Sequence, residues 1–207
     1  LQDFKSKFTK WSERTSTSPS GRHLGHYKAL FTPLSRSLDD DTKLNIQNYQ
    51  QQIAQLYVMV INYALTYGYS LERWKNITNV MIHKEVGNIN IHRLRVIHLY
   101  EADYTFCMGT HWNKAIHRSQ EADLLHPGQY GSRPGRDPTA VTLMEELRFD
   151  YSALTRQPMG LFDNDCSSCY NRILIPISSL TARGMGIHRN VVLVHATTLE
   201  EAKYKLK

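Results

Sequence analysis

Two short runs rich in β-branched residues, separated by a turn-prone segment, constrain the fold of this chain more than any other feature. The runs are NVMIHKE (79–85) and RLRVIHLY (93–100), and the segment between them is VGNIN. Runs of this kind on either side of a turn predict a β-hairpin, here with a long tip. Most other apolar residues recur at helical spacing, and a hairpin among helices predicts the α+β class.

The longest helical pattern lies before the hairpin. Its apolar residues recur every three or four positions and are Ile53, Leu56, Tyr57, Val60, Ile61, Ala64 and Leu65. This spacing predicts a helix with one buried face, capped by the polar segment SLDDDTK (37–43) and ended at Gly68. Gln55 and Asn62 make the stretch too polar to span a bilayer, and it is also too short, so no membrane association is expected.

Helices, a loop and one further strand are expected after the hairpin. A helix is predicted by the spacing of Tyr104, Cys107, Met108, Ala115 and Ile116. A Gly/Pro/Arg-rich loop at 126–138 precedes a second helix, with Asp137 as its cap and Pro138 in its first turn. The remaining expected elements are a short strand at 159–166, a helix from Pro176 to Gly184 or Gly186, and a helix at 195–207.

The charge balance favours a polyanionic partner. Lys and Arg number 25 against 19 Asp and Glu, which gives a net charge of +6. Residues 1–38 are the most basic part of the chain. Such a bias raises the local concentration of phosphate-bearing ligands, and nucleic acid is the most common of these. A soluble surface that happens to be basic is the alternative.

Two carboxylates follow an apolar segment, in a pattern that suits a metal ion. Asp163 and Asp165 are two residues apart at the end of the strand expected at 159–166. Residues at this spacing share one face of a strand, so both carboxylates would look into one cleft. Mg²⁺ prefers oxygen ligands and often takes only one or two protein carboxylates together with substrate phosphate. An Asp pair that caps a helix is the alternative.

The three cysteines predict neither a disulfide scaffold nor a metal site. They are Cys107, Cys166 and Cys169. So few cysteines favour a reducing compartment, the cytoplasm or the nucleus. Cys166 and Cys169 form a C-x-x-C, but no second pair completes the four ligands of a zinc site. Structural thiols are therefore expected.

Several segments, in order along the chain, resemble reverse transcriptases. FDNDCSSCYNRI (162–173) resembles the first palm motif of that family, and VMIHKEVGNINIHRLRVIHL (80–99) is similar to its fingers hairpin. GQYGSRPGRDPTAVTLMEEL (128–147) resembles the segment Gln-x-Gly-x-Arg-x-Gly-Arg and the helix after it. SPSGRHLGHYKAL (18–30) resembles the Pro/Gly-rich segment that precedes the fingers.

The resemblance implies part of a right-hand polymerase. Residues 1–75 would be a basic, helical N-terminal extension, 76–157 the fingers, and 158–207 the start of an incomplete palm. The family also needs a Tyr-x-Asp-Asp hairpin, and nothing after residue 173 resembles one. Cys169 stands where alanine is usual and Asn171 where aspartate is common. The implied enzyme is an RNA-directed DNA polymerase of a retroelement, and this chain alone is expected to be inactive.

The resemblance also assigns roles to residues in the palm motif. Asp165 would be a catalytic ligand of one of two Mg²⁺ ions, for which Mn²⁺ could substitute. The backbone carbonyl of Cys166 would support the second ion, and Asp163 is a fallback ligand. Tyr170 would lie under the sugar of the nucleotide and select deoxynucleotides.

The remaining assignments fall on basic residues. Lys84 and Arg95 would bind the incoming triphosphate, and Arg133 and Arg136 would contact the template or a phosphate. The implied partners are an RNA template, a DNA primer and deoxynucleoside triphosphates. Ordinary surface charges and a basic loop that shapes a helix cap remain the alternatives for these residues. Two other functions stay open, a non-catalytic nucleic-acid-binding remnant and an RNA-dependent RNA polymerase.

Overall fold

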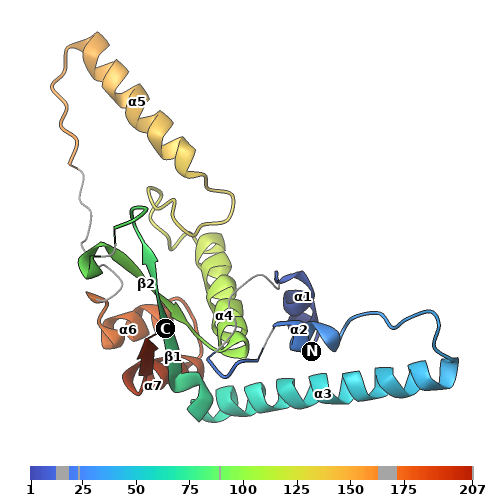
Figure 1. The fold of residues 1–207 in the computed structure, drawn as a ribbon. Helices are drawn as coiled ribbons and strands as arrows, with labels where there is room; N and C mark the ends of the chain where they lie inside the picture. The colour runs from blue at the N-terminus through green and yellow to red at the C-terminus, as the bar shows by residue number, and fades with distance from the viewer. Residues whose placement is uncertain (13–18, 23, 89, 163–171, 207) are drawn as a thin grey trace. The chain divides into compact units, whose positions relative to one another are not determined.

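The computed structural model describes residues 1–12, 19–22, 24–88, 90–162 and 172–206. It has helices and one small sheet, which confirms the α+β class (Figure 1). The chain forms two compact units: a first unit of residues 1–110 and 188–207, and a second unit of residues 111–187. These bounds differ from the divisions at 75 and 157 that the resemblance implied.

The sheet of the first unit has three strands in the order β2-β1-β3. The strands are β1 (Asn76–His83), β2 (Leu94–Leu99) and β3 (Lys203–Leu206). β1 and β2 pair antiparallel, with Thr78 opposite Leu99 and His83 opposite Leu94, so the predicted hairpin is confirmed. A short 3₁₀ helix, η2 (Ile91–Arg93), lies in its tip.

The expected helix at 195–207 is only partly correct. Helix α7 (Arg189–Glu200) ends at Glu200, and the residues after it form β3, which pairs parallel with β1. The segment Lys-Tyr-Lys-Leu alternates polar and apolar residues, as a strand does, and the free edge of β1 supplies its backbone partners. The pairing joins the two chain segments of the first unit in one sheet.

Helices surround an aromatic core at the start of the first unit. They are α1 (Gln2–Lys10), α2 (Leu24–Ala29) and α3 (Asp40–Tyr67), and the 3₁₀ helix η1 (Glu72–Lys75) follows α3 in the chain. Phe4, Phe8 and Tyr27 are buried, and the ring of Phe8 stacks on that of Tyr27 with 4.5 Å between centroids. Phe106 from α4 (Ala102–Glu121) contacts both phenylalanines, so this core ties α1 and α2 to the helix after the hairpin.

Helix α3 begins and ends as predicted. The side chain of Asp39 accepts a hydrogen bond from the backbone N–H of Thr42, and Gly68 adopts the left-handed conformation with φ 68°. Its buried face is narrower than predicted, because Ile61 and Ala64 are buried whereas Leu56 is 58% exposed. The helix packs through one narrow stripe, which periodicity alone does not reveal.

Among the residues that the structure describes, three α-helices contribute to the second unit. They are the later part of α4 (Ala102–Glu121), which begins in the first unit, α5 (Pro138–Thr155) and α6 (Ile175–Gly184). Asp137 caps α5 by accepting from the N–H of Thr139 at 2.9 Å, and Pro138 stands in the first turn, as predicted. The strand expected at 159–166 is wrong for residues 159–162, which form no strand, and its remainder lies outside the described residues. No described helix is long and apolar enough to cross a membrane.

Candidate nucleic-acid interface

The hairpin carries the two basic residues expected to bind phosphate. Arg95 lies on β2, directly opposite Ile82 of β1, and its side chain is exposed. Lys84 follows β1, and its backbone N–H donates to the carbonyl of Arg93 at 3.1 Å, which continues the ladder by one pair. Residues opposite each other share a face of the sheet, so the alternation places Lys84 and Arg95 on the same face.

The charges of this hairpin are only partly neutralised. Arg93, opposite Lys84, has Glu85 as an ion-pair partner at 3.6 Å. Within the part of the chain that the structure describes, no carboxylate lies within ion-pair distance of Lys84 or Arg95. Two cations thus remain available to an anionic ligand on an exposed surface.

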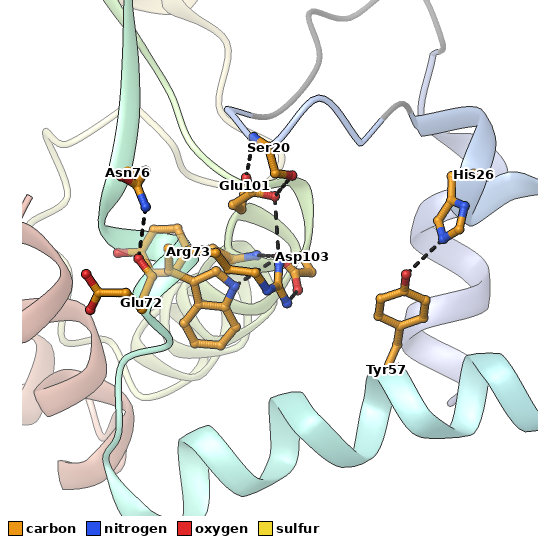
Figure 2. A network of polar contacts seen from close by, with 10 residues as sticks. Ser20, His26, Tyr57, Glu72, Arg73, Asn76, Glu101 and Asp103 are labelled. Atoms are coloured by element: carbon orange, nitrogen blue, oxygen red, sulfur yellow. Dashed lines mark hydrogen bonds and ion pairs between the residues drawn. The ribbon is translucent and has the colours of Figure 1, made fainter. Parts of the chain in front are cut away.

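A buried network of polar groups anchors the base of the hairpin (Figure 2). Glu101 follows β2, is fully buried, and accepts from the backbone N–H of Ser20 at 2.8 Å and from its hydroxyl at 3.0 Å. The carboxylate of Asp103 is also fully buried. It accepts hydrogen bonds from both terminal nitrogens of Arg73 and from the indole N–H of Trp74. Arg73 lies 3.7 Å from Glu101 as well. Buried carboxylates are tolerated only when they are paired in this way.

The same network accounts for the acidic segment after β2, which does not match the Tyr-x-Asp-Asp motif. Tyr100-Glu101-Ala102-Asp103 places a tyrosine before two acidic residues. The carboxylate of Asp103 pairs with Arg73, and the carboxylate of Glu101 accepts a hydrogen bond from Ser20 and lies near Arg73. Neither carboxylate has exposed surface. Their role here is structural, because they fix the path of the chain from β2 into α4.

A second ion-pair network joins η1 to β3. The carboxylate of Glu72 accepts hydrogen bonds from Lys203 and Lys75, and these two donors, Lys203 first, hold its pKa below the usual value. Lys75 also reaches Glu201 at 2.6 Å. These contacts fix the start of β3 beside β1 in the first unit.

The predicted template-contacting loop lies in the second unit, and its two arginines differ in exposure. Arg133 is buried, and its guanidinium donates to the carbonyl oxygen of His126 at 2.9 Å and to that of Gln129 at 3.4 Å. Arg136 is exposed and lies over the ring of Tyr130, 5.2 Å from its centroid. This geometry favours a loop-shaping role for Arg133 and leaves Arg136 as the residue of the pair that can reach a ligand.

The residues expected to perform the chemistry lie outside the described residues. These are Asp163, Asp165, Cys166 and Tyr170, together with Cys169 and Asn171. Their assignment therefore stays a prediction from the sequence. Within the described ranges, no group of three or more His, Cys, Asp or Glu side chains could hold a metal ion.

The described cysteine has the properties of a structural thiol, as predicted. Cys107 is buried in α4. Burial, helped by the nearby carboxylate of Asp103, raises the pKa of its thiol to about 12. A thiol with this pKa stays protonated at neutral pH and is a poor nucleophile.

Sequence reasoning missed the contribution of β3 to this interface. β3 places Lys203 opposite Asn76 and Lys205 opposite Thr78, so both lysines join the face that carries Arg95. The alternation in Lys-Tyr-Lys-Leu was the available signal. It follows directly on a helical segment, which masked it.

Comparison with known proteins adds no relative. No family model matches the sequence, and no curated protein matches it. A functional assignment therefore depends on the motifs and on the geometry of the hairpin.

Proposed function

We propose that this chain forms the fingers and the first part of the palm of a reverse transcriptase. The complete protein would carry out template-directed DNA synthesis from deoxynucleoside triphosphates. The observation that carries the proposal is the hairpin itself: Lys84 and Arg95, expected there from the resemblance, lie exposed on one face without a carboxylate partner among the described residues.

The chemistry of nucleotide addition fits these residue types. The reaction displaces pyrophosphate from an activated phosphorus, so the protein must mainly position the phosphates and offset their charge. A guanidinium at Arg95 can bind two phosphate oxygens at once, and the ammonium of Lys84 adds a point charge. In the proposed enzyme the carboxylate of Asp165 holds Mg²⁺, which offsets the charge that develops on the reacting oxygens.

A binding measurement on the chain itself tests whether it contacts the phosphates of a primer–template. The chain should bind a primer–template made of RNA and DNA, and the affinity should fall steeply between 50 and 200 mM salt, because released counterions drive such binding. Fluorescence anisotropy of a labelled primer–template gives both the affinity and its salt dependence. Affinity that does not change over this range contradicts a surface that contacts phosphates.

An extension assay tests the proposed DNA synthesis. A protein that contains this chain together with a Tyr-x-Asp-Asp hairpin should extend a DNA primer on an RNA template. Asp165→Asn should abolish extension while binding of the primer–template persists, because the substitution removes a metal-binding charge but leaves the phosphate contacts. Extension that survives in this variant refutes the metal assignment.

The two other functions give different results in the same assays. A non-catalytic remnant binds the primer–template but extends it in no version of the protein. An RNA-dependent RNA polymerase incorporates ribonucleotides as readily as deoxynucleotides. The aromatic Tyr170 favours the DNA polymerase, because an aromatic ring under the sugar leaves no room for a 2′-hydroxyl in the family that the chain resembles.

A further inference from the structure

Helix α3 carries a second apolar face besides the one that it buries. Its buried face is formed by Ala54, Ile61 and Ala64. At about 100° of rotation per residue, the second face is centred about 100° away around the helix. We call it the heptad stripe, and its residues, all of them exposed, are Tyr49, Ile53, Leu56, Val60, Tyr63 and Tyr67.

The spacing within the heptad stripe is that of a coiled coil. Its residues follow one another in steps of four and three, and the half-buried Ile46 precedes them at the same spacing, so the pattern covers three heptads. β-branched residues, Ile53 and Val60, occupy the first position of the heptad, and Leu56 occupies the fourth. In parallel coiled coils, this choice of residues favours two helices over three or four.

The helix has no charge near the heptad stripe, which limits the class of partner. Residues 44–67 contain no Asp, Glu, Lys, Arg or His, although the chain as a whole has a net charge of +6. A phosphate would find no cation on this face. Helices that lie on membranes carry Lys or Arg beside their apolar face, and α3 carries Gln and Asn instead. An uncharged protein surface is the partner that fits.

The flanking positions of the heptad favour a second copy of the same chain. Charges at these positions set the choice of partner in coiled coils, because like charges repel and opposite charges attract. All of them are neutral here, and they are Gln50, Gln52, Tyr57, Met59, Ala64 and Thr66. Two copies can therefore meet through the same patch, as in a two-fold symmetric dimer, without like-charge repulsion.

The area of the heptad stripe is sufficient for such a dimer. Tyr49, Tyr63 and Tyr67 are 66%, 60% and 67% exposed. An aromatic side chain has about 150–250 Å² to bury, so the three tyrosines of one copy offer about 300–500 Å². With the exposed aliphatic residues of the stripe, two copies offer more than about 1,000 Å², the area that a specific interface needs.

We propose that two copies of this chain associate through the heptad stripe of α3 and form a two-helix coiled coil. The inference goes beyond the proposed function, because the association needs neither nucleic acid nor a metal ion.

Sedimentation equilibrium of the full chain, after nuclease treatment, tests the proposal with two charge-matched variants. L56E/V60E places two carboxylates within the heptad stripe. Q51E/Q55E places two carboxylates on the same helix at the same four-residue spacing, at exposed positions outside the stripe. Circular dichroism verifies that both variants keep their helices.

The parent should have the mass of two chains at about 50 μM, which corresponds to a dissociation constant in the micromolar range. L56E/V60E should weaken the dimer at least about 100-fold, because the new carboxylates of each copy face those of the other. Q51E/Q55E should stay within about threefold of the parent. The parental dissociation constant should also change less than about threefold between 50 and 200 mM salt, because no counterions are released.

Several results would overturn the proposal. They are a parent with the mass of one chain at every concentration, a mass of three or more chains, and equal effects of the two double variants. An assembly that dissociates on nuclease treatment or as the salt concentration rises is held together by nucleic acid. That result overturns the coiled coil and supports the phosphate-binding surface of the proposed function. A nuclease-resistant dimer that binds no primer–template gives the reverse outcome, so the two proposals fail separately.

Discussion

Removing the arginine of the buried network should destabilise the protein far more than removing an arginine at its surface. Arg73 serves two carboxylates, those of Asp103 and Glu101, which have no exposed surface. Arg73→Met keeps much of the apolar stem but leaves both carboxylates in the interior without a cation. Breaking a buried ion pair by removing one partner costs about 3–5 kcal/mol, because the remaining charge is desolvated and unpaired.

A second arginine provides the matched control. Arg93 pairs with Glu85 at 3.6 Å, and both side chains are more than half exposed. Arg93→Met should therefore cost no more than about 1 kcal/mol. Urea denaturation followed by tryptophan fluorescence measures both changes, and Trp74, which donates its indole N–H to Asp103, lies in the affected network.

A double variant shows whether the unpaired charge is the cause. R73M/D103N should recover part of the lost free energy of unfolding, because the amide oxygen still accepts from Trp74 while one buried charge is gone. Equal effects of Arg73→Met and Arg93→Met, with no recovery in the double variant, would refute the reasoning.

Three other outcomes follow from the first unit. Burial lowers the pKa of His195, so the unfolded chain binds this proton more tightly than the folded chain. The free energy of unfolding should therefore decrease as the pH is lowered past about 6.5. In His195→Gln, the free energies of unfolding at pH 7 and pH 5.5 should differ less than in the parent protein. Gly68→Ala should cost about 1–2 kcal/mol in denaturation, because φ is 68° and a Cβ would lie 2.9 Å from the Leu193 side chain. Cys107 should resist iodoacetamide at pH 8 in the folded protein and react in urea, as mass spectrometry can show.

Local signals in the sequence predicted the caps, whose hydrogen bonds close within a few residues, and the hairpin, whose two strands follow each other in the chain. The hairpin, the cap at Asp39, the left-handed Gly68 and the cap at Asp137 are all of this kind. Each depends on residue types at short spacing, which a reader of the sequence can see. The width of the buried stripe on α3 depends on neighbours from elsewhere in the chain, and that is why periodicity overestimated it.

The parts that could not be predicted depend on residues far apart in the sequence. β3 pairs with β1 across more than half of the chain, with Lys203 opposite Asn76. Four residues after a helix carry too little signal to predict a strand unless the free edge of its partner is known. Likewise, Arg73 and Ser20 lie far from Asp103 and Glu101 in the sequence, so no local signal predicts these buried contacts.

The two networks of the first unit place its charges where they have different effects. Glu101 and Asp103 are buried, where they share the guanidinium of Arg73 and accept hydrogen bonds from Ser20 and Trp74. Arg95 and Lys205 stay at the surface of the sheet, where no described carboxylate offsets them. A count of charges weights all of these equally, so the net charge of +6 understates how positive this face is to an approaching anion.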